Sequence, residues 1–368
     1  MSSSHLSISA PVVIIIVSVV LLLNSHVGSC SCYKRIFGFG DGTMDTGNFV
    51  HMLGKAPSRL KELPYGKTFF KNATGRMSDG RVLIDFYAEA LQLPLIPPIL
   101  PEKDYGQFPY GANFAVMGAT VLEAPLYPGS SLFSLGVQTD WFDEMVYLRA
   151  TGDDARKHFL RDSDLILMGE IGSNDYFAYF SAGNKPHGNA ADEYITNVMT
   201  YIMHFVEELI LDRGAKVFVI PNNFPVGCWA SYLSRFHSDN PEDYDEHKCL
   251  RWLNNFTQKH NERLRWEVNR LRNFYPHVKL IYADYYGATM DFIKNPSKFG
   301  IDDPVVACCG GDGPYHTSME CNSTAKIWGD PGRFANWDGM HMTEKAYNII
   351  VQGVINGPFA DPPFPQSC

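Results

Sequence analysis

Residues 35–48 read RIFGFGDGTMDTGN, a short apolar run that is followed at once by a glycine-rich turn. The run at Arg35–Phe39 is typical of a buried strand in a parallel sheet. Four similar runs occur further along the chain, separated by longer segments with the apolar spacing of helices. These four runs cover residues 113–116, 165–168, 216–220 and 279–282.

The alternation of strands and helices predicts an α/β fold with a central five-stranded parallel sheet and helices on both of its faces. The clearest helical segments cover residues 195–211, 252–274 and 343–355, and Thr343 is a suitable cap for the last one. Active sites in such sheets lie outside the carboxyl ends of the strands. The polar motifs that follow the strands are therefore the candidate functional residues.

The composition excludes several classes of protein. The chain has 368 residues, of which 45% are hydrophobic, so wholesale disorder is excluded. Its formal net charge is −9 and no cluster of Lys and Arg stands out, so no nucleic-acid partner is expected. The absence of long apolar runs excludes a polytopic membrane protein, and we expect no stable membrane insertion.

The amino terminus resembles a targeting segment. Residues 11–23 read PVVIIIVSVVLLL, a run shorter than the about 20 apolar residues that a spanning helix needs. Polar and then small residues follow, which is the layout of a secretory signal peptide over residues 1–29, cleaved near Ser29 or Cys30. The segment before the apolar run has no Lys or Arg, which is unusual for a signal peptide. An N-terminal anchor is the alternative. We expect a secreted, extracellular protein.

The eight cysteines fit an oxidising compartment. None are spaced as zinc ligands, so no metal is expected. Cys228 with Cys249, and either Cys308 or Cys309 with Cys321, would close short loops, each stabilising the fold by about 2–4 kcal/mol. Three Asn-x-Ser/Thr sequons are candidate glycosylation sites: Asn72, Asn255 and Asn322.

Glycine-rich and polar turns follow the first three strands. The turn at residues 39–48 has neither the dinucleotide-binding fingerprint nor a P-loop. After the second strand, Gly118 allows a backbone N–H to approach a ligand closely. After the third strand, Asn174 offers an amide donor where an oxyanion could develop. Each of these motifs alone is equally compatible with a structural turn.

A fourth motif, Asp338-Gly339-Met340-His341, lies just before the last helical segment. An aspartate three residues before a histidine can hold the imidazole through Nδ1–H and leave Nε2 free as a base. The alternative is that Asp338 only caps the turn before the helix.

In order and in spacing, these four motifs together resemble the plant GDSL esterase/lipase family of the SGNH-hydrolase superfamily. Further matching stretches are residues 75–81 (GRMSDGR), 225–228 (PVGC) and 307–310 (ACCG). The resemblance implies a single domain over residues 30–368, built as a flavodoxin-like three-layer α/β/α sandwich. It also implies a cofactor-free hydrolase of carboxylic esters in the apoplast or cell wall, whose partner is a small-molecule or glycan ester.

The sequence departs from the family pattern at one position. The first block of the family reads Gly-Asp-Ser-Leu and its serine is the nucleophile, whereas Gly42 occupies that position here. The resemblance assigns Gly42, Gly118 and Asn174 as oxyanion donors, and Asp338 and His341 as orienting acid and base. Gly42 keeps its N–H but provides no hydroxyl.

Four interpretations of this departure stay open. The chain could be a non-catalytic relative that binds an acyl or acetylated-glycan ligand. It could be a hydrolase in which His341 activates a water in place of the serine hydroxyl. Thr43 could act as the nucleophile, or Gly42 could be a natural or engineered replacement in an otherwise active enzyme.

Overall fold

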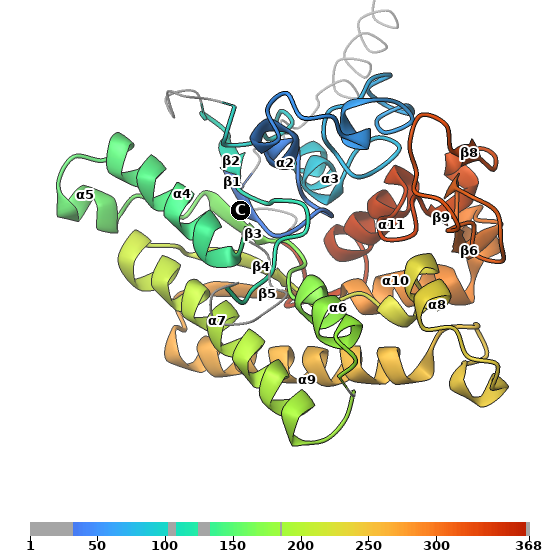
Figure 1. Cartoon of the computed structure of the whole chain (residues 1–368). Helices are drawn as coiled ribbons and strands as arrows, with labels where there is room; N and C mark the ends of the chain where they lie inside the picture. The colour runs from blue at the N-terminus through green and yellow to red at the C-terminus, as the bar shows by residue number, and fades with distance from the viewer. Residues whose placement is uncertain (1–31, 102–107, 124–132, 185, 366–368) are drawn as a thin grey trace, which may run out of the picture.

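The computed structural model describes residues 32–101, 108–123, 133–184 and 186–365 (Figure 1). The predicted signal peptide over residues 1–29 lies outside these residues, so it stays a prediction. Within the described residues, no helix combines the length and the apolar character needed to cross a membrane.

Within the described residues, six strands form the central sheet, in the order β10-β5-β4-β3-β1-β2. The parallel strands are β1 (Arg35–Phe39), β2 (Gly111–Asn113), β3 (Asp164–Met168), β4 (Val217–Pro221) and β5 (Lys279–Ala283). The five predicted parallel strands are thus confirmed. One strand was not predicted: β10 (Ala360–Asp361) pairs with β5 in the antiparallel direction at the edge of the sheet.

The second strand lies two residues earlier than predicted, because β2 covers Gly111–Asn113 and only Asn113 of the predicted residues 113–116 belongs to it. The Asn113 amide donates hydrogen bonds to Met44 O and Thr46 Oγ1, at 2.6 and 3.1 Å. Its side-chain oxygen accepts a hydrogen bond from the N–H of Ala115. Residues 114–116, three of the four predicted strand residues, therefore lie outside the strand, and Asn113 ties this segment to the turn after β1.

Helices cover both faces of the sheet (Figure 1). One layer contains α4 (Leu135–Arg149), α7 (Asn189–Arg213) and α9 (Arg251–Phe274). The other layer contains α3 (Leu83–Ala90), α10 (Tyr285–Lys294) and α11 (Glu344–Ile355). The three predicted helices correspond to α7, α9 and α11, and the hydroxyl of Thr343 caps α11 by accepting a hydrogen bond from Ala346 N. The three-layer α/β/α architecture is confirmed.

Short elements complete the fold. The short helices are α2 (Asn48–Met52), α5 (Asp153–Lys157), α6 (Ser173–Ser181) and α8 (Ala230–Arg235). Single 3₁₀ turns occur at Arg59–Lys61, Val226–Cys228, Pro241–Asp243, Pro296–Phe299 and Pro331–Arg333. Two small sheets pair β6 (Asp303–Ala307) with β9 (Phe334–Asn336), and β7 (Cys309–Gly310) with β8 (Lys326–Ile327).

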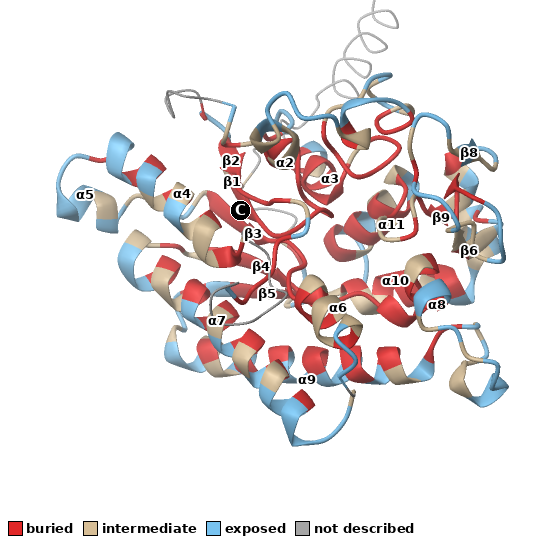
Figure 2. Ribbon diagram, viewed as in Figure 1, coloured by how far each residue is buried: buried red, intermediate tan, exposed pale blue. Residues whose placement is uncertain are grey.

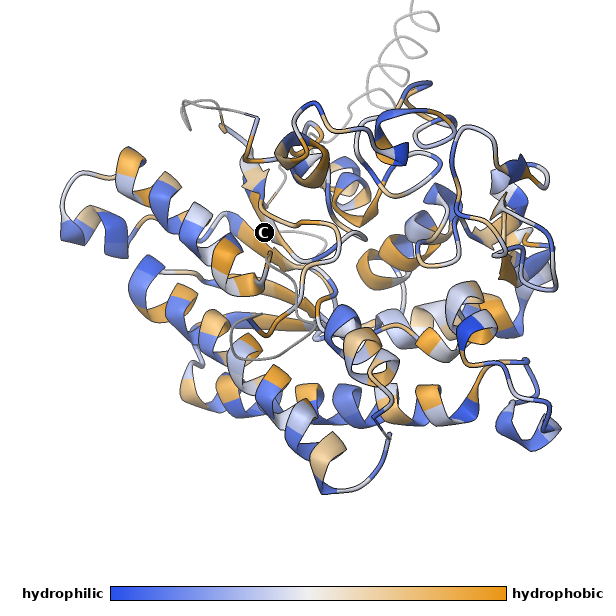
Figure 3. Ribbon diagram, in the orientation of Figure 1, coloured by the Kyte–Doolittle hydropathy of each residue, from blue (hydrophilic) through white to orange (hydrophobic). Residues whose placement is uncertain are grey.

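The core lies between the sheet and the two helical layers. Burial is concentrated in the strands and on the inward faces of the helices (Figure 2), and these are also the most hydrophobic parts of the ribbon (Figure 3). The strand β3, for example, is buried along its whole length. The apolar runs that predicted the strands are therefore the centre of the core, as expected for strands covered on both faces.

Two disulfides join described residues, Cys228–Cys249 and Cys309–Cys321. The choice left open by the sequence is thereby decided, because Cys309 forms the second bridge and Cys308 is a free, buried thiol. Cys308 packs in a small apolar cluster with Leu60 and Trp337, and burial raises the pKa of its thiol to about 12.

The Cys228–Cys249 bridge should contribute measurably to stability. It closes a loop with a sequence separation of 21 residues, for which loop-closure entropy predicts about 3 kcal/mol. We expect a Cys228→Ala, Cys249→Ala double variant to lose about that much free energy of unfolding in urea titrations under non-reducing conditions. Cys308→Ala is the matched control and should lose clearly less, since it leaves both bridges intact. Equal losses would contradict the assignment of the bridge as a main stabilising element.

Candidate active site

Residues from distant parts of the chain converge at the carboxyl ends of the strands. Gly42 follows β1, Asn174 lies in the first turn of α6 after β3, and His341 follows β9. A Cβ atom built on Gly42 would lie only 2.8 Å from Nε2 of His341. The Asn174 amide nitrogen lies 3.2 Å from a carboxylate oxygen of Asp41, the residue before Gly42. Gly42, Asn174 and His341 therefore form one group, and the Asn174 amide also donates to the carbonyl of Ala119, the residue after Gly118.

Asp338 holds the imidazole of His341 in a fixed orientation. Both carboxylate oxygens lie 3.0 Å from Nδ1. The carboxylate also accepts hydrogen bonds from the N–H groups of Met340 and His341, and from the hydroxyl of Tyr65 at 2.8 Å. With Nδ1–H donated to the aspartate, Nε2 is left as a proton acceptor that faces Gly42.

The electrostatics of this pair favour an ionised aspartate. Burial acts to raise the pKa of Asp338, but the charge of His341, their hydrogen bond and the charge of Arg59 outweigh it and lower the pKa to about 2. A permanent negative charge next to Nδ1 stabilises the protonated imidazole, which a general base must form during reaction.

The space next to Gly42 is already occupied. The Cβ position lies 2.8 Å from His341 Nε2 and 3.0 Å from Sδ of the buried Met77. A serine side chain would fit only after the imidazole or the thioether moved by a few tenths of an ångström. Met77 belongs to the stretch at residues 75–81, which matched the family pattern, but nothing in the sequence assigned it a place in the site.

Two backbone donors at the site are free. Among the described residues, the N–H groups of Gly42 and Gly118 donate to no acceptor. Gly118 has a positive φ of 74°, and an added Cβ would contact nothing within 4 Å, so the backbone there borders open space. These two unpaired N–H groups can donate hydrogen bonds to a carbonyl oxygen on which negative charge develops.

The side-chain amide of Asn174, unlike the two backbone N–H groups, is already hydrogen-bonded within the protein. Its amide nitrogen donates hydrogen bonds to Asp41 Oδ2 at 3.2 Å and to Ala119 O at 2.9 Å. An amide nitrogen has two hydrogens, so both are in use. Asn174 could donate to a ligand only by giving up one of these bonds, and its assignment as the third oxyanion donor stays a prediction.

The hydroxyl of Thr43 is directed at Asp41. The Thr43 Oγ1 atom donates to Asp41 Oδ1 at 2.8 Å, and the Thr43 N–H donates to the same oxygen at 2.9 Å. Burial raises the pKa of Asp41, while these two hydrogen bonds and the charge of His341 act to lower it. The threonine therefore serves to hold the turn after β1, and its hydroxyl is not presented to the base.

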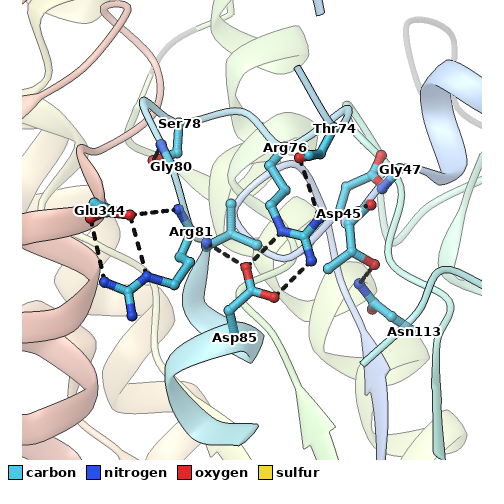
Figure 4. Close-up of polar contacts among 12 residues, drawn as sticks. Asp45, Gly47, Thr74, Arg76, Ser78, Gly80, Arg81, Asp85, Asn113 and Glu344 are labelled. Carbon is cyan, nitrogen blue, oxygen red and sulfur yellow. Dashed lines mark hydrogen bonds and ion pairs between the residues drawn. The ribbon is translucent and has the colours of Figure 1, made fainter. Parts of the chain in front are cut away.

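A buried polar network fixes this turn (Figure 4). Asp45 accepts hydrogen bonds from the N–H groups of Gly47 and Asn48, both at 2.7 Å. Arg76 pairs with Asp85 through two hydrogen bonds of 2.7 and 2.8 Å, and also donates to the carbonyl of Thr46. No role could be assigned to Arg76 from the sequence, because its partners Thr46 and Asp85 lie in other segments of the chain.

The remaining candidate residues are the three sequon asparagines. Asn72 and Asn255 are exposed, and Asn322 is half-buried with its side-chain oxygen accepting from Thr324 N and Oγ1. Glycosylation at the three sequons stays a prediction. Within the described ranges, no group of three or more His, Cys, Asp or Glu side chains is arranged to hold a metal ion.

A doubly covered parallel sheet with an Asp–His pair and free backbone donors at its carboxyl edge is the arrangement of a hydrolase that acts on acyl groups. The chain belongs to the GDSL-like lipase/acylhydrolase family, whose family model matches residues 36–354. Members of this family are hydrolases of ester bonds, in agreement with the resemblance seen in the sequence.

Curated plant proteins are similar along almost the whole chain. A GDSL esterase/lipase of Arabidopsis thaliana is 43% identical over 354 residues, covering 92% of this chain and 88% of the relative. The sinapine esterase of Brassica napus is 40% identical over 362 residues, covering 95% and 92%. Among solved structures, a candidate GDSL-like lipase from Parabacteroides merdae is 12% identical with a TM-score of 0.38, covering 87% of this chain and 93% of its own.

Breaking the Arg76–Asp85 pair should destabilise the protein strongly. Both side chains are buried, so Arg76→Met would leave an uncompensated charge and should lower the free energy of unfolding by about 3–5 kcal/mol. Adding Asp85→Leu should restore part of the loss, because it removes that charge. The control is Arg333→Met, which breaks an exposed ion pair and should cause no measurable change. Similar urea midpoints for the Arg76 and Arg333 variants would contradict this expectation.

The Asp338 carboxylate should make the free energy of unfolding depend on pH in the acidic range. Its folded pKa of about 2 lies below the ordinary value of 3.8, so its contribution is present above pH 4 and is lost as the pH falls through 2. The difference in free energy of unfolding between wild type and Asp338→Asn should shrink by about 2 kcal/mol from pH 5 to pH 2. Asp162→Asn, at an exposed aspartate, should show no such trend. A constant difference for Asp338→Asn would refute the assigned ionisation.

Proposed function

We propose that this chain is a secreted hydrolase of carboxylic esters in which His341 activates a water molecule directly, without a covalent intermediate on residue 42. The observation that carries the proposal is the intact Asp338–His341 pair, whose Nε2 faces a residue with no side chain. The free N–H groups of Gly42 and Gly118 support it, because they supply oxyanion stabilisation at the same place.

The proposed reaction proceeds in two steps. Nε2 of His341 takes a proton from water while the water oxygen forms a bond to the ester carbonyl carbon. The carbonyl oxygen becomes negative and accepts hydrogen bonds from the N–H groups of Gly42 and Gly118. The carbon–oxygen bond to the alcohol then breaks, and the imidazolium returns its proton to the leaving alkoxide. The products are a carboxylic acid and an alcohol, and Asp338 stabilises the imidazolium throughout.

The expected rate is low. In a serine hydrolase, removal of the nucleophile costs about 10⁶ in turnover. The oxyanion donors and substrate binding alone still leave an acceleration of roughly 10³–10⁴ over water. A nucleophilic role for Thr43 is not part of the proposal, because its hydroxyl donates to Asp41.

A second candidate function is non-catalytic binding of an acyl or acetylated-glycan ligand. The close approach of His341 and Met77 to Gly42 favours it, since these side chains have taken the space that a serine would need. In this case the two free N–H groups would bind the carbonyl of the ligand, and no bond would be broken.

The extracellular location is also a proposal. The signal-type sequence at residues 1–29 supports it, and so do the two disulfides, because disulfides persist mainly in oxidising compartments. The substrates to test are aryl acetates, longer acyl esters and acetylated xylan, which sample small, long-chain and sugar-linked esters. The name of the Brassica napus relative adds sinapine to this panel.

The decisive experiment compares mature wild type with His341→Ala and Gly42→Ser on this panel. We expect slow turnover by wild type and a loss of at least about a hundredfold in His341→Ala, since general base catalysis contributes about 10²–10⁴. His158→Ala, a control at an exposed histidine, should show no change. Wild type should form no adduct with a serine-directed phosphonate, whereas Gly42→Ser should become labelled and gain activity once the imidazole shifts.

Other outcomes would overturn the water route. A phosphonate adduct on wild type would show a nucleophile elsewhere in the chain. If wild type cleaves none of the esters but binds acetylated oligosaccharide or a fatty acid, the non-catalytic function is correct instead.

A further inference from the structure

The side chain of Asn174 joins the two turns that carry the free backbone donors. Its amide nitrogen donates a hydrogen bond to Oδ2 of Asp41, the residue before Gly42, at 3.2 Å. The same nitrogen donates to the carbonyl of Ala119, the residue after Gly118, at 2.9 Å. The amide therefore contacts the neighbours of both free N–H groups, while its own two hydrogens are in use.

The two acceptors that hold the Asn174 amide differ in chemistry. The carbonyl oxygen of Ala119 belongs to the backbone and accepts hydrogen bonds at any pH. The acceptor on Asp41 is a carboxylate oxygen, and protonation removes its charge and makes the group a donor. Hydrogen bonds to an ionised group are roughly twice as strong as those to a neutral one. A neutral Asp41 would therefore release one amide hydrogen, and the bond to Asp41 is already the longer of the two.

The carboxyl group of Asp41 keeps its position without Asn174. Its Oδ1 atom accepts hydrogen bonds from the N–H and the hydroxyl of Thr43, at 2.9 and 2.8 Å. These bonds fix the carboxyl group in the turn after β1 and occupy Oδ1. A proton would therefore be taken up at Oδ2, the oxygen that faces Asn174.

The backbone of Asn174 is held from both sides. Oε1 of Glu170 accepts hydrogen bonds from the N–H and the hydroxyl of Ser173, at 3.1 and 2.7 Å. The carboxylate of Asp175 accepts from the N–H groups of residues 121–122, at 2.8 and 2.9 Å. The first turn of α6 is thereby fixed, so the release of Asn174 requires only a rotation of its side chain.

Titratable groups from several elements lie close enough to interact with the charge of Asp41. They are Glu170 after β3, Tyr232 on α8, His341 before α11 and Tyr347 on α11. Burial raises the pKa of both tyrosines above its ordinary value, so they stay neutral. Burial also raises the pKa of Asp41, and the charge of His341 acts in the opposite direction.

Glu170 leaves the negative charge of this acidic pair on Asp41. Its side chain is fully buried, and Oε2 has no hydrogen-bond partner among the described residues. Burial, and then the charge of Asp41, raise the pKa of Glu170 well above its ordinary value. Glu170 is therefore neutral at neutral pH, and Asp41 is the carboxyl group whose charge reaches Asn174.

We propose that Asp41 is a positioning residue that withholds Asn174 from the oxyanion site. While its carboxyl group is ionised, it occupies one amide hydrogen of Asn174, and when it is neutral that hydrogen is free for the carbonyl oxygen of a ligand. The charge of Asp41 then decides whether the site has two or three donors. The inference rests on the proposed function and deepens it, because it describes a regulation of the same site.

The first test follows the side-chain amide of Asn174 by NMR and needs no catalysis. Its two hydrogens are assigned by their absence in Asn174→Ala. We expect their signals to shift in wild type as the pH falls from 8 to 4. In Asp41→Asn they should stay near their low-pH position, because an amide at position 41 has no charge to lose. Asp162→Asn, at an exposed aspartate, should titrate like wild type. The wild-type titration keeps the test informative if Asp41→Asn does not fold.

The second test asks whether the released amide binds a carbonyl group. Acetanilide is the probe, because its carbonyl is neutral and its amide bond resists hydrolysis. At pH 8 it should shift the Asn174 signals of Asp41→Asn at an about tenfold lower concentration than those of wild type. This ratio corresponds to one charge-assisted hydrogen bond that no longer has to be broken. At pH 4 wild type should approach the variant.

The third test uses the hydrolysis of an aryl acetate at pH 8. Asp41→Asn should raise kcat/KM about 10²-fold, the lower end of what one oxyanion donor contributes. The same change made in Asn174→Ala should give no such gain, because no amide is then available for release. The comparison of the two backgrounds separates the effect of the amide from the direct effect of the Asp41 charge.

Three results would overturn the inference. Equal shifts of the Asn174 signals in wild type and Asp41→Asn would assign the titration to another group, such as His341. Equal acetanilide concentrations for both proteins would show that the released amide is no donor. An equal gain in the Asn174→Ala background would assign the effect to charge alone. The two NMR tests are independent of the proposed reaction, because the expected shifts support the role of Asp41 even in a protein that cleaves no ester.

Discussion

The hold of Asp338 on the imidazole of His341 is the interaction on which the rest of the site depends. Two carboxylate oxygens at 3.0 Å from Nδ1 fix the ring, and the Tyr65 hydroxyl fixes the carboxylate in turn. This arrangement directs Nε2 at Gly42, 299 positions earlier in the chain. The buried Arg76–Asp85 pair holds the turn after β1, in which Gly42 lies, through the hydrogen bond from Arg76 to the carbonyl of Thr46. Base and backbone donors therefore face each other across one small region.

The site combines an intact proton acceptor with a missing hydroxyl. Every residue except proline has a backbone N–H, so a glycine in place of the serine keeps the N–H donor at residue 42. The proton acceptor is equally preserved, because the contacts that orient it do not involve a side chain at residue 42. What changes is the space between them, which the imidazole and Met77 now approach closely. A site of this kind retains the features that bind and polarise a carbonyl group.

Most of the architecture could be predicted from local patterns, and the exceptions have identifiable causes. Buried parallel strands appear as apolar runs, so all five were found. The strand β10 has only two residues, too few to produce a pattern. The segment at 114–116 is apolar, but the side chain of Asn113 bonds to the turn after β1 and ends the strand. Similarly, Cys308 and Cys309 are adjacent, and only their positions in space show which one reaches Cys321.

The sequence by itself determined the order of strands and helices, the family resemblance, and the candidates Gly42, Gly118, Asn174, Asp338 and His341. These features are carried by residue types at short spacing, which a reader can recognise without coordinates. Only the tertiary structure decided that Met77 crowds residue 42, that both amide hydrogens of Asn174 are in use, and that Tyr65 supports Asp338. Each of these is a contact between segments far apart in the chain, and its distance is set by the packing of the whole domain.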